Sequence, residues 1–260
     1  MPLNLTTKSR ITWCPGCPNG QILVAFRQAV QELVDQDHIK VENLVAFAGI
    51  GCHGKISDYL NMNSFTSLHG RLIPSMTGAK CANPNLIPIG FSGDGDSYSE
   101  GLEHLIHAAR RNSDIKLFIH DNQVYALTTG QASAMSPLGY QSKTTPLGSI
   151  EPPFNPLLTM LAAGATFVAR SYAGDLANTK RLMTAAIRHK GFAYVDIIQP
   201  CITFFDTRDY FKEKIYWIDE SGPRDNLDKA MALVSVDNGK VPLGIFFDVT
   251  HKTFEEQLVS

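Results

Sequence analysis

Short apolar runs alternate with stretches of helical periodicity along most of the chain. The apolar runs are rich in Val, Ile and Phe and are bounded by turn residues, which is typical of buried strands. We expect such strands over residues 43–51, 86–95, 114–122, 165–170 and 192–200. The stretches between them predict helices over residues 20–37, 70–81, 99–111 and 175–190. Strands that alternate with helices predict an α/β fold, in which a parallel sheet is covered by helices on both faces.

Two further segments do not follow this alternation. Residues 139–156 contain four prolines and little periodicity, so we expect a long loop there, and long ordered loops in compact domains are often functional. After Cys201 the pattern is less regular and predicts an irregular extension with one more strand. We therefore expect residues 1–200 to form the main α/β domain and residues 201–260 to form a C-terminal extension of the same structural unit.

The composition is that of an ordinary globular protein, with 44% hydrophobic residues and a net charge of −2. Near-neutral charge gives no electrostatic reason to expect binding to nucleic acid or to a membrane surface. No apolar run approaches the roughly 20 residues that span a bilayer, and the stretch "MPLNLTTKSR" lacks the apolar core of a secretory signal. These features predict a cytoplasmic protein, in which cysteines normally stay reduced.

The five cysteines are widely scattered, which argues against a disulfide framework. They are Cys14, Cys17, Cys52, Cys81 and Cys201. The first two form a C-x-x-C pair in the turn-rich stretch "WCPGC". Such a pair can be half of a zinc site, a redox disulfide, two ligands of an iron–sulfur cluster, or two thiols without a role. A thioredoxin-like role is disfavoured, because no predicted strand directly precedes the pair.

The turn "GDGD" lies at the end of the second predicted strand, and "DN" ends the next one. Because the carboxyl ends of neighbouring parallel strands meet at one edge of a sheet, Asp94 and Asn122 should lie close together. A carboxylate, an amide oxygen and a backbone carbonyl, together with phosphate oxygens and water, are suitable ligands for Mg²⁺. The glycines let backbone N–H groups approach a ligand, and the following helix favours a phosphate at its N-terminus.

Other interpretations of this segment fit its sequence less well. "GDGD" by itself is a common turn, and an Asp at a helix start is often only a cap. No Glu occupies the loop position that an EF-hand calcium site requires. A nicotinamide-binding fingerprint needs a third glycine where Tyr98 stands. We interpret Asp96 and Glu100 as charges at the helix N-terminus rather than as a catalytic pair.

The segment "GDGD", followed by "DNQVYALTTGQ", resembles the thiamine diphosphate motif. Together with "WCPGC", "GIGC", "HGR", "TGAK" and "QPC", it resembles the β subunit of the 2-oxoacid:ferredoxin oxidoreductases from Ile11 to about Cys201, and more loosely beyond. The resemblance implies a thiamine diphosphate-binding fold of the diphosphate type, with an N-terminal loop that helps to bind one [4Fe–4S] cluster. The family usually has Gly in place of Pro18, and Pro-Thr or Val-Thr in place of Ile202-Thr203.

Most of the expected cofactor ligands follow from this resemblance. The implied Mg²⁺ ligands are Asp94, Asn122 and the carbonyl of Val124. The implied cluster ligands are Cys14, Cys17, Cys52 and Cys201. The other residues implied at thiamine diphosphate are Gly93, Gly95, Thr128, Thr129, Gly130, His69 and Cys52. Cys81 is left over inside a predicted helix, and we expect it to be a small buried apolar residue.

The resemblance also implies three residues near the reacting atoms. His69 would contact the cofactor, Lys55 would face the carboxylate of a 2-oxoacid, and Leu127 would form a wall of the pocket. Each has an ordinary alternative: a structural histidine, a solvent-exposed lysine and a leucine that packs in the core.

The implied activity is the coenzyme A-dependent oxidative decarboxylation of a 2-oxoacid, with electrons passing through the cluster to ferredoxin. In this family the pyrimidine-binding domain and its activating Glu lie on a separate α subunit, so we expect an obligate heterodimeric partner. One alternative is a non-redox thiamine diphosphate decarboxylase or synthase chain with zinc or no metal at the cysteines. Another is an iron–sulfur electron carrier that binds no thiamine. The sequence does not name the 2-oxoacid, although Lys55 slightly favours one with a second carboxylate.

Overall fold

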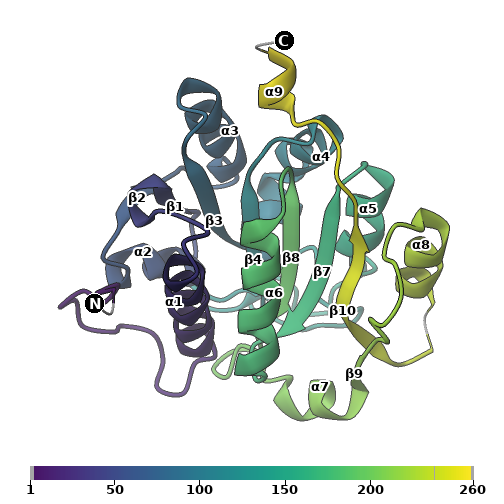
Figure 1. Cartoon of the computed structure of the whole chain (residues 1–260). Helices are drawn as coiled ribbons and strands as arrows, with labels where there is room; N and C mark the ends of the chain where they lie inside the picture. The colour runs from purple at the N-terminus through teal and green to yellow at the C-terminus, as the bar shows by residue number, and fades with distance from the viewer. Residues whose placement is uncertain (1–2, 237, 259–260) are drawn as a thin grey trace.

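The computed structural model describes residues 3–236 and 238–258. Their central element is an eight-stranded sheet (Figure 1). In spatial order the strands are β2 (Asn63–Thr66), β1 (Leu44–Ala48), β3 (Ile87–Gly93), β4 (Lys116–Asp121), β8 (Ala193–Ile198), β7 (Phe167–Tyr172), β10 (Val241–Asp248) and β9 (Ile215–Trp217). Neighbours from β2 to β7 are parallel, whereas β10 runs antiparallel to β7 and parallel to β9. The predicted α/β fold with a mainly parallel sheet is confirmed.

Helices cover both faces of this sheet (Figure 1). One face packs against α1 (Asn19–Asp35), α2 (Ile56–Tyr59) and α6 (Leu176–Arg188). The other packs against α3 (Leu72–Ala82), α4 (Leu102–Arg111), α5 (Pro156–Ala162) and α8 (Leu227–Ser235). The four predicted helices correspond to α1, α3, α4 and α6, and their ends lie within a few residues of the prediction. The sheet is thus buried on both faces, as a parallel sheet requires.

The C-terminal segment is more regular than expected. It contains α7 (Arg208–Lys214), β9, α8, β10 and α9 (Phe254–Leu258), so two strands are present where the sequence predicted one. The missed strand β9 has only three residues, too few to show an alternating pattern. Strand β2 was also missed, because all four of its residues are exposed and most are polar. Both strands lie at the edges of the sheet, where side chains are less buried and the hydrophobic pattern in the sequence is therefore weakest.

Cys81 is exposed, so the expectation of a buried cysteine was wrong. The buried face of α3 is formed by Leu72, Ile73, Met76 and Lys80, which recur at the spacing of three or four residues that places side chains on one face of a helix. Cys81 is one position out of phase with Met76 and Lys80 and therefore faces away from the sheet.

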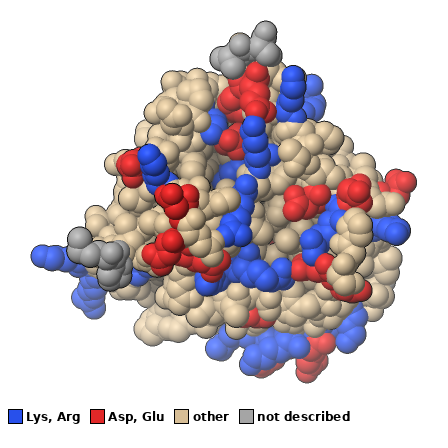
Figure 2. Space-filling model, in the orientation of Figure 1, with Lys and Arg blue, Asp and Glu red and all other residues tan. Residues whose placement is uncertain are grey.

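Basic and acidic side chains are interspersed on the face of the molecule shown in Figure 2. Along α6, Lys180 forms an ion pair with Glu32 of α1, and Arg181 pairs with Glu220 at 2.6 Å. These pairs join elements that are distant in the sequence.

Among residues 3–236 and 238–258, no helix is both long and apolar enough to cross a membrane.

A buried ion pair lies at the start of β4. The Lys116 ammonium donates to Asp114 at 2.6 Å and to the carbonyls of His189 and Gly191 at 2.5 and 2.9 Å. Lys80 pairs with the other Asp114 oxygen at 2.8 Å. Burial alone would raise the pKa of Asp114, but the two ammonium groups outweigh it and hold this pKa well below its usual range. Asp114 therefore compensates the charge of a lysine that is 2% exposed.

We expect Asp114→Asn to lower the free energy of unfolding by about 3–5 kcal/mol, because the buried Lys116 would lose the carboxylate to which it is hydrogen-bonded. Urea unfolding at pH 7 measures this loss, with exposed Asp225→Asn as the matched control. Because the pKa is depressed in the folded state, the carboxylate contributes its full stabilisation above the unfolded-state pKa of about 3.9, and this contribution is lost progressively as the pH falls from there through the lower pKa of the folded state. The difference between the two proteins should therefore shrink below about pH 4. Equal stability at pH 7 would contradict the assigned role of Asp114.

Candidate active site

Asp94 follows β3 and Asn122 follows β4, and both line one cavity at the carboxyl edge of the sheet. The two strands are neighbours in parallel register, with Gly93 beside His120, so their ends bring the two side chains together. Both side chains are buried, at 1% and 8% exposure. This is the arrangement that the order of predicted strands implied.

The oxygen atoms at this edge suit a divalent cation. Asp94 accepts a hydrogen bond from Ser133, and burial raises its pKa to about 7. A bound cation would favour the ionised form of such a carboxylate. The Asn122 Oδ1 atom accepts from the Val124 N–H at 3.1 Å, and the Val124 carbonyl accepts from the Ala126 N–H at 2.9 Å. Each of these oxygens has a second lone pair, so a carboxylate, an amide and a carbonyl can serve as Mg²⁺ ligands here.

Two glycines of the "GDGD" turn allow aromatic side chains to pack directly against its backbone. A Cβ atom on Gly93 would lie 2.6 Å from the His53 ring, and one on Gly95 would lie 2.3 Å from the Tyr125 ring. A π-helical turn begins at Gly95, before α4 and earlier than the predicted helix start at residue 99. Backbone N–H groups at the start of a helical turn favour a phosphate. The turn therefore fits a diphosphate next to the cation ligands.

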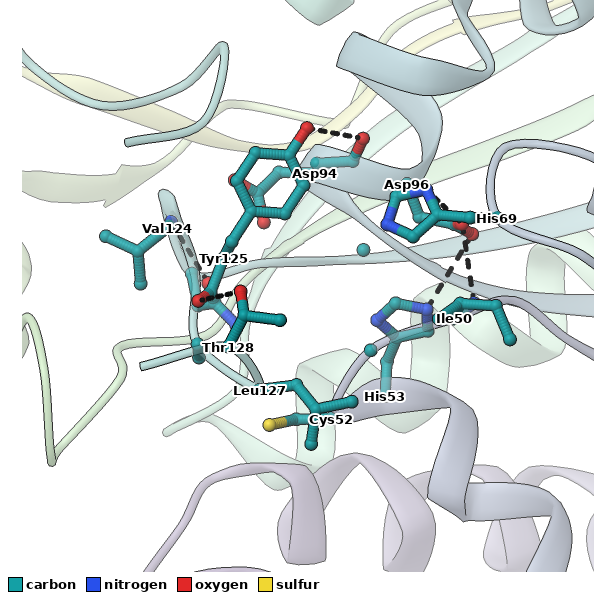
Figure 3. Close-up of a pocket in the computed structure, with 15 residues that line it drawn as sticks. Ile50, Cys52, His53, His69, Asp94, Asp96, Val124, Tyr125, Leu127 and Thr128 are labelled. Atoms are coloured by element: carbon teal, nitrogen blue, oxygen red, sulfur yellow. Dashed lines mark hydrogen bonds and ion pairs between the residues drawn. The ribbon is translucent and has the colours of Figure 1, made fainter. Parts of the chain in front are cut away.

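Asp96 lies in the first turn of the π-helical segment, as a helix-terminal charge would, and it also lines the cavity. It is 3% exposed and accepts hydrogen bonds from the Gly70 N–H at 2.8 Å and the Ser92 hydroxyl at 2.6 Å. Figure 3 shows Asp96 between His53 and His69, whose ring nitrogens lie 3.8 and 3.5 Å from its oxygens. Burial alone would raise the pKa of Asp96, but His53 and these hydrogen bonds lower it overall.

His53 was not identified from the sequence. It is 5% exposed, lines the cavity, and its Nε2 has no hydrogen-bond partner among the described residues. Its neighbours come from the turn after β1 and from the "GDGD" turn, which lie far apart in the sequence. Its position directly after Cys52 was the only available signal, and that position has no periodicity by which a role can be recognised.

Some of the remaining residues implied at the cofactor line the cavity and others do not. Residues 127–130 lie in the turn of the hairpin of β5 (Val124–Tyr125) and β6 (Gln131–Ala132). His69, Leu127 and Thr128 line the cavity, and Leu127 is 49% exposed. Thr129 and Gly130 have positive φ angles of 80° and 96° and do not belong to the cavity lining. A Cβ atom on Gly130 would lie 3.0 Å from Phe204, so this glycine allows the hairpin to approach the loop that follows Cys201.

Four of the five cysteines line a second cavity of about 220 Å³: Cys14, Cys17, Cys52 and Cys201. They come from the N-terminal loop, the turn after β1 and the loop after β8. The Trp13 indole donates to the Cys52 carbonyl at 2.6 Å and holds two of these segments together. Burial raises the pKa of Cys17 to about 11, and the three other nearby thiols act in the same direction.

These thiols suit a cluster in their number and chemistry. Residues 3–236 and 238–258 contain no group of three or more His, Cys, Asp or Glu side chains gathered as around one metal ion. A cubane cluster needs a wider arrangement, because each cysteine binds a different iron.

The two departures from the family pattern are accommodated by their surroundings. Pro18 is the N-cap residue of α1, and Ile202 packs near Gly16.

The two cavities share a wall. Cys52, Asn122, Ala126 and Leu127 line both of them. Lys55 lines the cysteine cavity, where its ammonium donates to the Thr12 hydroxyl at 2.9 Å. A group bound at the "GDGD" turn would therefore lie next to a group bound by the cysteines.

Comparison with known proteins agrees with this geometry. Residues 49–197 match the family described as "Thiamine pyrophosphate enzyme, C-terminal TPP binding domain", and residues 201–260 match the C-terminal family of the "Pyruvate ferredoxin oxidoreductase beta subunit". The β subunit of 2-oxoacid:ferredoxin oxidoreductase 2 from Aeropyrum pernix is 40% identical over 98% of this chain and 86% of its own length. The KorB subunit of 2-oxoglutarate synthase from Methanocaldococcus jannaschii is 34% identical over 95% of this chain and 90% of its own.

A solved structure is similar over nearly the whole chain. It is a 2-oxoglutarate:ferredoxin oxidoreductase from Magnetococcus marinus with 2-oxoglutarate, coenzyme A and succinyl-CoA bound. The TM-score is 0.94 at 36% identity, with 99% of this chain and 88% of that chain covered. The fold, the thiamine pyrophosphate-enzyme domain and these relatives together show that the chain belongs to the β subunits of the 2-oxoacid:ferredoxin oxidoreductases.

Proposed function

We propose that this chain binds thiamine diphosphate, Mg²⁺ and one [4Fe–4S] cluster, and that with an α subunit it oxidises a 2-oxoacid to an acyl-CoA and reduces ferredoxin. The observation that carries the proposal is the wall shared by the "GDGD" cavity and the four-cysteine cavity. Decarboxylation followed by one-electron transfer needs the two cofactors to be neighbours, and a non-redox decarboxylase has no such need. Residues 1–200 and 201–260 act as one unit in this proposal, supported by the pairing of β10 with β7.

The protein's part in this reaction is to hold and orient the reactants. Thiamine diphosphate supplies the carbanion-stabilising chemistry when it is bound. Asp94, Asn122 and the Val124 carbonyl would hold Mg²⁺, and the Gly93 and Gly95 backbone would face the diphosphate. His69, fixed by Asp96, would contact the cofactor, and Leu127 would separate it from the cysteine cavity.

Several observations support an obligate partner. The cavity at the "GDGD" turn measures only about 70 Å³, whereas pockets for ligands of this size usually measure ~300–1,000 Å³. Large apolar side chains are exposed nearby: Leu68 beside His69 at 77%, and Leu147 and Ile150 at 96% and 89%. The last two share a hollow with Tyr125 of the active site. Exposed apolar surface of this kind marks a protein interface, and the relatives are named as β subunits.

The decisive experiment is metal analysis of the chain purified without oxygen, alone and with its α subunit. We expect about four irons and four sulfides per chain and a [4Fe–4S] EPR signal after reduction. Thiamine diphosphate should bind tightly, and coenzyme A-dependent ferredoxin reduction should appear only with the α subunit. Zinc in place of iron would favour the non-redox decarboxylase. Full turnover by the isolated chain would disprove the need for a partner.

Lys55 offers a test of substrate recognition. We expect Lys55→Met to raise the KM for the preferred 2-oxoacid about 10-fold or more, because a charge-assisted hydrogen bond to a carboxylate is lost. Steady-state kinetics of the holoenzyme with pyruvate and with 2-oxoglutarate would measure this, with exposed Lys40→Met as the control. An unchanged KM for both substrates would contradict a role of Lys55 in substrate binding and would limit it to its hydrogen bond with Thr12.

A further inference from the structure

Gln199 connects the two cofactor cavities. It directly follows β8, in the "QPC" motif, and is 1% exposed. Its backbone N–H donates to the Asp121 carbonyl at 2.7 Å, which fixes the residue at the carboxyl edge of the sheet. Its side chain then lies between Asn122, which lines both cavities, and Cys17 of the four-cysteine cavity.

The side-chain amides of Asn122 and Gln199 form a chain in which every hydrogen bond has the same direction. The Val124 N–H donates to Asn122 Oδ1 at 3.1 Å. Asn122 Nδ2 donates to Gln199 Oε1 at 3.4 Å, and Gln199 Nε2 donates to Cys17 Sγ at 3.7 Å. Gln199 Nε2 also donates to the Pro200 carbonyl at 3.2 Å, and this acceptor favours the orientation in which the amide nitrogen is on the side of the sulfur.

This chain has a consequence at each end. At Asn122, the acceptor on Gln199 keeps the amide nitrogen turned away, so that the oxygen is the atom presented to a cation. At Cys17, an N–H donor to a ligand sulfur stabilises the extra electron of a reduced cluster and raises its reduction potential. A cation on Asn122 Oδ1 polarises the amide and strengthens its N–H donor, and hydrogen bonds in a chain strengthen one another.

We propose that Gln199 is a positioning residue that couples the magnesium ligand Asn122 to the cluster ligand Cys17, so that loading of thiamine diphosphate with Mg²⁺ raises the reduction potential of the cluster. The proposal rests on the proposed function, because it needs both cofactors on this chain. The effect favours electron transfer only when the cofactor that supplies the electrons is in place.

The test is an EPR-monitored redox titration of the complex with the α subunit, carried out with and without bound thiamine diphosphate and Mg²⁺. In the wild type, we expect loading to move the cluster potential in the positive direction. In Gln199→Leu, which has similar volume and no amide, the potential of the unloaded enzyme should be more negative, and the shift on loading should fall to roughly half or less. Mg²⁺ affinity, measured by calorimetry, should fall about 10-fold, because Asn122 loses the partner that orients it.

Thr203→Val is the matched control, because the Thr203 hydroxyl donates to Cys14 Sγ at 3.3 Å but is not bonded to Asn122. This variant should also lower the potential, yet keep the full shift on loading. Gln199→Met provides a second variant if Gln199→Leu does not fold with a full complement of iron.

A loading shift of equal size in the wild type and both Gln199 variants would overturn the proposal, as would a wild-type enzyme with no shift. Absence of the cluster or of thiamine diphosphate from the wild type would instead refute the proposed function itself.

Discussion

Asp94→Ala should abolish Mg²⁺-dependent binding of thiamine diphosphate, raising the dissociation constant by more than about 100-fold. Asp94 is the one carboxylate among the three proposed Mg²⁺ ligands, so its loss removes the only negative charge that the protein supplies to the cation. Its side chain is 1% exposed, and water cannot easily replace it in the same position. Calorimetric titration of the complex with the α subunit, first freed of thiamine diphosphate and then titrated with it at fixed Mg²⁺, would measure the effect.

Glu100→Gln is the control for this variant, since it removes a carboxylate at an exposed position of the π-helical turn that directly follows Asp94. It should bind the cofactor as the wild type does. The iron content of Asp94→Ala should also stay normal, because none of the four cysteines contacts Asp94 through a hydrogen bond in the described part of the chain. Unchanged cofactor affinity in Asp94→Ala would rule out the assigned Mg²⁺ site.

Cys17→Ser should remove the cluster, and with it the reduction of ferredoxin, while thiamine diphosphate still binds. Cys17 is the half-buried member of the C-x-x-C pair, and serine is a poor substitute for a thiolate that binds iron. We expect ferredoxin-dependent turnover to fall at least about 100-fold, in line with the loss of a metal ligand. Iron and sulfide analysis, EPR and calorimetry with thiamine diphosphate would separate the two effects.

Cys81→Ser is the natural control, because Cys81 is exposed on α3 and does not line the cysteine cavity. It should keep its iron and its activity. A Cys17→Ser protein with wild-type iron content and ferredoxin reduction would exclude Cys17 as a ligand and return the C-x-x-C pair to a structural role.

The sequence predicted the site best where one rule of the fold decided it. Asp94 and Asn122 each follow a buried strand, and neighbouring parallel strands end at one edge, so their proximity followed from the pattern alone. His53, and the place of Asp96 in the cavity, were missed because the environment of both residues is made by turns from three parts of the chain. No local sequence pattern predicts that the turn after β1 packs against the "GDGD" turn.

The same limit explains the other errors. Cys81 was expected to be buried because it lies in an apolar helix, but burial on a helix depends on phase, and Cys81 is out of phase with Met76 and Lys80. The Gln199 bridge depends on two side-chain amides that meet only when β8 lies beside β4. A sequence shows the residue types in such a contact and does not show that they meet.

The origin of the four cysteines has one more consequence. They come from the N-terminal loop, the turn after β1 and the loop after β8, so a cluster bound to all of them would act as a cross-link between segments that are remote in the sequence. A cross-link that closes long loops restricts the unfolded chain and the local opening of the native one. Damage by oxygen to such a cluster would therefore loosen the segments that hold the four cysteines, so that loss of the electron carrier would also lower the resistance of the chain to unfolding.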